Sequence, residues 1–298
     1  MNSTFPPCCL MLVSLISLCA CDPESYDDSG PQQDRSLGED VTAIVSYSVQ
    51  DGEISDPVYY DVPDGYVEEQ EDKDSHQELW DYTKDFFRTK MDFVSTFTIM
   101  TDGEDEVLAS VFQVETDPYA WTIAVDFADA FHGDGELDTS DLSRTLVHEF
   151  GHLLSLNQEQ IPVDLELFEN QDDQDIFDEK KAECETFFIQ EGCTEQDAYL
   201  NTFYQVFWTE LIGEFNSIDE IEDDEERDAA KADFYEEHQN QFVSDYAATN
   251  VTEDFAESWT VYVLDGRPQG EAVKDQKVRF FEDYPEVEAI RQDILESL

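Results

Sequence analysis

The sequence predicts an α+β fold, in which a twisted mixed β-sheet carries helices on one face and a mostly helical C-terminal half follows. Two observations predict it. Short β-branched runs bounded by turn residues recur between residues 41 and 127, apart from one helical stretch. From residue 142 onward, apolar residues recur mainly at three- and four-residue steps, which is the period of an amphipathic helix.

The chain is strongly acidic and long enough, at 298 residues, for a full hydrophobic core. Its 15 Lys and Arg stand against 74 Asp and Glu, which gives a formal net charge of -59. Charge of this size repels nucleic acid and anionic bilayers, so neither is expected as a partner. Two explanations stay open. We favour a salt-rich habitat, where screening removes the self-repulsion, over a polyvalent affinity for cations such as calcium.

Residues 1–21 are predicted to be a lipoprotein-type signal peptide. The apolar run from Leu10 to Leu18 is only nine residues long, too short to span a bilayer. It continues into Cys19-Ala20-Cys21, and together with Leu18 these residues resemble the lipobox of bacterial lipoproteins. Cleavage before Cys21 would leave this cysteine as the lipid-bearing N-terminus. The alternative is an ordinary secretory signal, since no Lys or Arg precedes the run. Either signal takes the protein out of the cytoplasm.

Residues 22–40 contain Pro, Ser, Gly, Gln and acids with little to bury, and are predicted to be a flexible acidic tether. Removal of the signal would take away three of the six cysteines, and lipidation would use Cys21. Cys184 and Cys193 remain as an even pair in an oxidising compartment. We therefore predict that they form a disulfide closing a short loop.

Folding is expected to begin near residue 41, and residues 41–157 are predicted to form the sheet and the first functional helix. Residues 51–70 are rich in turn dipeptides. A helix is expected over 75–91, and the expected strands are Val41–Val49, Phe93–Met100, Val107–Glu115 and Trp121–Phe127. The last of these, through Asp126, is either an edge strand that pairs with an extended substrate or an ordinary sheet strand.

An acidic, glycine-rich turn, Phe131–Asp138, leads into the next helix. It is a weak candidate for a calcium site, because it does not fit the twelve-residue calcium-loop pattern.

The stretch Leu142–Leu156 carries the strongest functional pattern. Its apolar residues have helical period, Ser140 or Asp138 can cap its start, and Asn157 can end it. His148 and His152 are one turn apart on this helix, so both imidazoles can bind one zinc ion. Glu149 lies beside them, where it can take a proton from the attacking water.

A tetrahedral zinc site with two histidines and a water needs a third protein ligand. The extended zinc-protease pattern is excluded, because Ser155 and Gln158 stand at its glycine and histidine positions. The better candidate for the third ligand lies in Tyr246–Trp259. Within this stretch begins a helix that Asn250 or Thr252 can cap and that runs to about Leu264. Glu253 and Glu257 are one turn apart on it among apolar residues, where carboxylates are costly unless they bind a metal or a hydrogen-bond donor.

Together, His148-Glu149-Phe-Gly-His152 and Tyr246 to Glu257 resemble the glutamate-zincin metallopeptidases, in particular the lethal-factor-like branch and its bacterial lipoprotein relatives. The matching pattern covers about a tenth of the chain. The resemblance implies that Glu253 is the third ligand, that Glu257 orients a ligand imidazole, and that Tyr246 stabilises the oxyanion. It also implies a zincin-like fold, whose order of strand, helix, strands and metal helix this chain follows. The gap of about a hundred residues between His152 and Glu253 departs from the usual pattern.

Residues 158–245 are expected to be a helical insertion, with an aromatic helix over 195–215 and a highly charged helix over 219–242. His238 lies in the charged helix, and we expect it on the solvated surface. Residues 246–298 are expected to carry the third-ligand helix and then one or two amphipathic C-terminal helices.

The sequence therefore predicts a monomeric zinc metallopeptidase with one catalytic zinc ion, acting on a peptide or protein substrate outside the cytoplasm, with membrane contact only through a lipid at Cys21. Two alternatives stay open. One is a metal hydrolase of non-peptide amides. The other is a surface-anchored capture protein that keeps the scaffold without turnover, although such a binder would have no use for Glu149.

Overall fold

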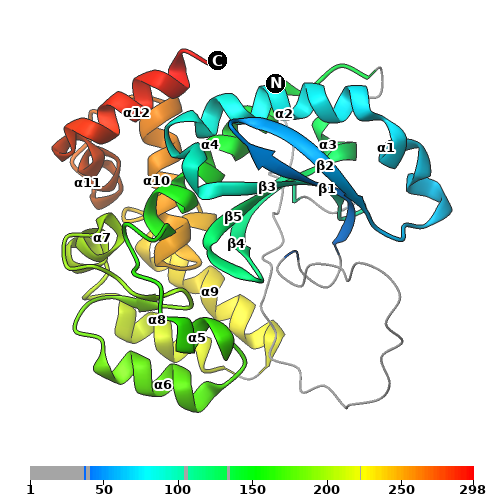
Figure 1. Cartoon of the computed structure of the whole chain (residues 1–298). Helices are drawn as coiled ribbons and strands as arrows, with labels where there is room; N and C mark the ends of the chain where they lie inside the picture. The colour runs from blue at the N-terminus through cyan, green and yellow to red at the C-terminus, as the bar shows by residue number, and fades with distance from the viewer. Residues whose placement is uncertain (1–36, 38–40, 104–106, 133–134, 222) are drawn as a thin grey trace.

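The computed structural model describes residues 37, 41–103, 107–132, 135–221 and 223–298 (Figure 1). The predicted signal peptide, the lipidated Cys21 and, apart from Leu37, the tether lie outside the described residues. The same holds for Gly133 and Asp134 of the acidic turn. No helix in the described ranges is both long and apolar enough to cross a membrane.

The main sheet has five strands in the order β2-β1-β3-β5-β4. The pair β3–β5 is parallel and the other neighbouring pairs are antiparallel, so the sheet is mixed, as predicted. Its strands are β1 (Thr42–Gln50), β2 (Glu53–Tyr59), β3 (Val94–Thr101), β4 (Ala109–Val114) and β5 (Asp117–Asp126).

The two faces of this sheet differ because successive side chains of a strand point to opposite sides. One face carries large apolar residues such as Phe97 on β3 and Ile123 on β5, which are register partners and fully buried. Against it packs α2 (Lys73–Phe87), whose Trp80 ring lies 5.0 Å from that of Phe97. The other face includes small polar residues, and there Ser46 of β1 hydrogen-bonds Thr98 of β3 at 2.8 Å.

Of the two alternatives for the strand Trp121–Asp126, the ordinary sheet strand is correct and the edge strand is not. This segment belongs to β5, which pairs with β3 on one side and β4 on the other. The short connection after Val114 turns the chain back on itself, so β4 is added outside β5 and becomes the edge.

Strand β2 lies within the stretch that the sequence assigned to turns. Asp51 and Gly52 both have positive φ, 53° and 76°, which is the conformation of a two-residue hairpin turn. They join β1 to β2, whose residues are mostly exposed. An exposed edge strand lacks apolar alternation, which is why its sequence reads as turns.

The helices occupy most of the second half of the chain, and Figure 1 shows α5 to α9 gathered at the lower left, away from β1 and β2. Besides α2, the α-helices of the described residues are α1 (Val67–Glu71), α3 (Phe127–Ala130), α4 (Thr139–Leu156), α5 (Leu165–Glu169), α6 (Gln174–Glu183), α7 (Tyr199–Phe207), α8 (Ile212–Asp219), α9 (Asp224–His238), α10 (Val251–Leu264), α11 (Val273–Phe280) and α12 (Pro285–Leu295).

The predicted aromatic helix over 195–215 is interrupted. It divides into α7 and α8, because Trp208 leaves the helix and points its indole into the core. The charged helix α9 is shorter than predicted. A single hydrophobic cluster nonetheless runs from β1 and α2 through α4 to Phe203, Phe234 and α12.

Candidate metal centre

Helix α4 begins and ends at the residues the sequence singled out. The Asp138 side chain accepts a hydrogen bond from the amide of Ser140, which caps the N-terminus. At the other end, the Asn157 side chain donates to the carbonyl of Leu153 at 2.7 Å. Between these caps, His148 and His152 lie in the buried part of the helix.

Helix α10 crosses α4 at very close range. Its N-cap is Asn250, whose side chain accepts from the amide of Glu253 at 2.9 Å. At the crossing, a Cβ placed on Gly151 would come within 3.0 Å of the Cα of Ala256 and 2.9 Å of the Trp259 ring. Only glycine fits there without a shift of one helix. This contact sets the distance between the histidine helix and the glutamate helix.

The crossing brings three predicted ligands together: His148, His152 and Glu253. The Nε2 atoms of the two histidines are 3.1 Å apart. Oε2 of Glu253 lies 3.0 Å from the first and 3.3 Å from the second. Ligand atoms of a tetrahedral zinc ion would be separated by about 3.3 Å. The donor set and its spacing therefore fit zinc.

Hydrogen bonding alone does not account for these contacts. Nδ1 of His148 lies 2.9 Å from Oε1 of Glu257, so this nitrogen carries a proton that it donates to the carboxylate. In a neutral imidazole, Nε2 is then an unprotonated acceptor, yet it faces an oxygen of Glu253 and a nitrogen of His152. This arrangement needs either a metal ion between the three side chains or an added proton on one of them.

Without a metal, His148 takes the added proton. Burial alone would lower the pKa of His148, but its hydrogen bonds to Glu253 and Glu257 outweigh burial and raise the pKa to about 10. Burial likewise opposes the charged form of Glu253, but the two histidines hold the pKa of this carboxyl well below its usual range.

Glu257 is itself held in place. Its second oxygen accepts a hydrogen bond from the Ser244 hydroxyl at 2.6 Å. The same hydroxyl oxygen accepts from the amide of Ala247 at 3.0 Å, just after Tyr246. Ser244 was not singled out in the sequence, because a serine thirteen residues before a glutamate carries no spacing signal of its own.

Glu149 is buried next to both histidines, with 8 % of its surface exposed. Burial raises the pKa of Glu149, while the histidines and the backbone amide of Val111 work against that rise. Val111 lies on β4, the edge strand of the sheet. The candidate base therefore lies between the histidines and an open strand edge.

Tyr246 lies in a 3-10 turn, Tyr246–Ala248, just before α10. Its ring centroid is 5.7 Å from that of His148, and the charge of Glu253 acts on its hydroxyl. Burial, with Glu253 and Glu149, raises the pKa of Tyr246 far above its usual value, so the hydroxyl keeps its proton. It can serve as a hydrogen-bond donor at this site.

The opposite side of α10 is anchored in the core. Asp254 and Lys277 are both completely buried, and Nζ of Lys277 lies 2.5 Å from Oδ2 of Asp254. The indole of Trp208 donates to the same oxygen at 2.7 Å. Nζ also lies 4.0 Å from the ring centroid of Phe242. This network holds Asp254 in place, and Asp254 is the residue directly after Glu253.

The remaining histidines lie apart from the site. His76 is buried, with Nδ1 bonded to the Tyr47 hydroxyl and Nε2 to a backbone carbonyl. His132 is exposed and lies 3.5 Å from Asp138. His238 is only partly exposed and lies 3.2 Å from Glu214, so the expectation of a solvated surface residue holds in part.

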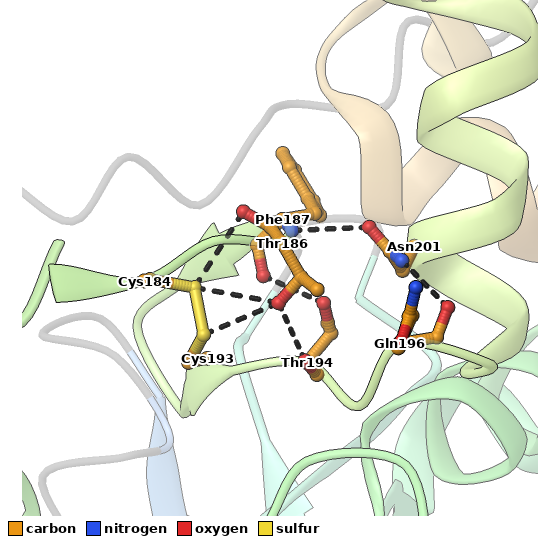
Figure 2. The surroundings of a disulfide bond; sticks show 7 residues. All are labelled: Cys184, Thr186, Phe187, Cys193, Thr194, Gln196 and Asn201. Atoms are coloured by element: carbon orange, nitrogen blue, oxygen red, sulfur yellow. Dashed lines mark hydrogen bonds between the residues drawn. A yellow bond between two sulfur atoms is a disulfide. The ribbon is translucent and has the colours of Figure 1, made fainter.

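The predicted disulfide between Cys184 and Cys193 is present, and the two Cα atoms are 5.6 Å apart. It borders a small hairpin of β6 (Phe188–Ile189) and β7 (Gly192–Cys193). Figure 2 shows how this loop is tied to α7, where the Asn201 side chain accepts from the amide of Phe187 and donates to the carbonyl of Gln196.

The turn of this hairpin carries Glu191, which the sequence analysis missed. Burial raises the pKa of Glu191, and the charge of His152 acts in the opposite direction. The sequence feature that could have drawn attention to Glu191 is its position between Cys184 and Cys193.

In comparisons with protein-family models, curated proteins and solved structures, nothing matches this chain. The resemblance to the glutamate-zincins therefore stays an inference from the two motifs.

Proposed function

We propose that this chain is a zinc metallopeptidase that hydrolyses peptide bonds outside the cytoplasm, with a zincin-like fold and a lipid anchor at Cys21. The observation that carries this proposal is the convergence of His148, His152 and Glu253 within 4.8 Å of one another, beside a buried glutamate. Two histidines and a glutamate are a ligand set that catalytic zinc sites with three protein ligands use, which supports the proposal.

In this proposal, the two histidines and Glu253 hold the ion, and the Glu257 carboxylate orients His148. A zinc ion in such a site lowers the pKa of water and polarises a carbonyl group. Glu149 would accept the proton of the attacking water and deliver it to the leaving amine. Burial raises the pKa of Glu149 above that of an exposed carboxyl group, which favours its holding the proton between the two steps. Tyr246 would donate its hydroxyl to the developing oxyanion.

The substrate backbone would pair with β4. Among the described residues, β4 pairs with β5 alone, and the backbone amide of Val111 interacts with Glu149. An extended peptide added to a strand edge is held through its main chain, largely independently of its side chains.

A digest of casein or a mixed peptide library, with and without chelator, tests the proposal. The expected result is cleavage that a chelator abolishes, that zinc restores and that Glu149→Gln loses. Zinc binding without cleavage of any peptide would favour the capture-protein alternative. Cleavage at the wild-type rate by Glu149→Gln would refute the assignment.

A further inference from the structure

A second group of acidic side chains lies where the parallel strands β3 and β5 end. Asp102 directly follows β3, and Asp126 is the last residue of β5. Asp129 lies three residues on, in the short helix α3. Carboxylate oxygens of all three residues lie within 4.8 Å of one another.

Two of these carboxylates are buried: Asp102 is 8 % exposed and Asp126 is 1 % exposed. Neither forms an ion pair with a Lys or Arg among the described residues. Asp126 is satisfied by three backbone amides. Its Oδ1 accepts from Ala128 and Asp129, and its Oδ2 accepts from Asp102. These bonds hold the carboxylates together although like charges repel.

The oxygens of Asp102 are not equally satisfied. Oδ2 accepts from the amide of Val107 at 2.7 Å. Oδ1 is shielded from solvent and has no hydrogen-bond partner within the described part of the chain. A buried, unpartnered carboxylate oxygen beside two further carboxylates is costly unless a cation binds there.

We propose that Asp102, Asp126 and Asp129 bind a hard divalent cation, of which calcium is the best fit. Calcium takes six to eight oxygen ligands and accepts carboxylates together with water. The donor set here contains oxygen only, whereas the histidine site offers nitrogen, which favours zinc. Such an ion would tie the ends of β3 and β5 to the start of α3. The site is separate from the zinc proposal and stands whether or not the chain is a peptidase.

The alternative is a proton shared within the pair. Burial, with the charge of Asp102, raises the pKa of Asp126, while the surrounding amides oppose that rise. A shared proton would satisfy the buried oxygen without a metal, and calcium would then have no specific effect. The experiment must distinguish calcium binding at this site from a shared proton and from nonspecific calcium binding to a chain of net charge -59.

Calcium chloride is titrated into the calcium-free, zinc-loaded protein in 0.5 M NaCl, where diffuse surface binding is screened. Thermal unfolding and calorimetry are followed. We expect one saturable site and an upward shift of the unfolding midpoint by roughly 5 °C at calcium 100-fold above its Kd. Asp102→Asn keeps an acceptor for Val107 and should lose the site. Asp228→Asn, which removes an exposed charge on α9, should keep it.

Asp129→Asn provides a second variant, because Asp129 is exposed and its loss leaves the buried bonds of Asp126 intact. It should weaken calcium binding at least tenfold even if Asp102→Asn fails to fold. The proposal is overturned if calcium produces no saturable shift, or if Asp129→Asn responds to calcium as Asp228→Asn does.

Discussion

Nδ1 of His148 and Oε1 of Glu257 lie 2.9 Å apart, although 109 positions separate the two residues in the chain. The bond joins α4 to α10 and fixes which imidazole nitrogen faces the other candidate ligands. Glu257→Ala should therefore lower zinc affinity by about 10- to 100-fold, because His148 loses its fixed tautomer and orientation. Competition with a chromophoric chelator measures this change. Ser244→Ala, which removes only the support of Glu257, should have a smaller effect in the same direction.

Glu149→Gln should keep zinc and lose peptide hydrolysis by about 100- to 10,000-fold, since the amide cannot accept the proton of water. His148→Ala should lose both. Zinc content by elemental mass spectrometry and turnover on one peptide separate the two effects. A parallel loss of zinc in Glu149→Gln would mean that Glu149 supports the site rather than the reaction.

The close crossing of α4 and α10 depends on Gly151. Gly151→Ala should destabilise the fold by about 1–3 kcal/mol, because the new methyl group meets Ala256 and Trp259 with no space to relax. The matched control is Gly213→Ala in α8, where a Cβ meets nothing within 4 Å. This control should be neutral or stabilise by up to about 1 kcal/mol. Equal stability of the two variants in urea unfolding would contradict the close-approach explanation.

The buried pair Lys277 and Asp254 should be costly to break. Lys277→Met leaves Asp254 as an unpaired buried acid and should cost about 3–5 kcal/mol of unfolding free energy. Combining it with Asp254→Asn removes that charge and should recover part of the loss. If the double variant is no more stable than Lys277→Met, the two side chains are not coupled as described.

The stability of the metal-free protein should depend on pH through His148. Its folded pKa, raised to about 10 by the surrounding glutamates, exceeds the ordinary value of 6.5, so the folded state binds the proton more tightly. The resulting stabilisation is complete below about pH 6.5 and is lost as pH rises through about 10. Thermal unfolding in the presence of chelator should show this decline. His148→Gln should flatten it, and an unchanged slope in that variant would assign the decline to other groups.

Much of the site could be predicted from the sequence because its signals are local. Helix α4 shows its period, its Asp138 cap and the spacing of His148 and His152 within one short stretch. Helix α10 does the same through Asn250, Glu253 and Glu257. The spacing gives the chemistry of each helix, and the family resemblance suggested that they meet.

The parts that could not be predicted from the sequence depend on contacts between distant segments. Strand order is set by pairing across the sheet, so nothing local to Trp121–Asp126 marks β5 as internal and β4 as the edge. Strand β2 is exposed and carries no apolar alternation. The support of Glu257 by Ser244 and the burial of Lys277 against Asp254 arise only in the folded chain. So does the orphan oxygen of Asp102.

The most direct test of the central claim is the zinc affinity of Glu253→Ala, because this residue joins the second helix to the histidine pair. Wild-type protein should bind one zinc ion per chain at this site. Glu253→Ala should bind it more than about 100-fold more weakly, as expected for loss of one of three protein ligands. The matched control Glu237→Gln, an exposed acid on α9, should bind as the wild type does. Equal zinc affinity in Glu253→Ala and wild type would contradict the account.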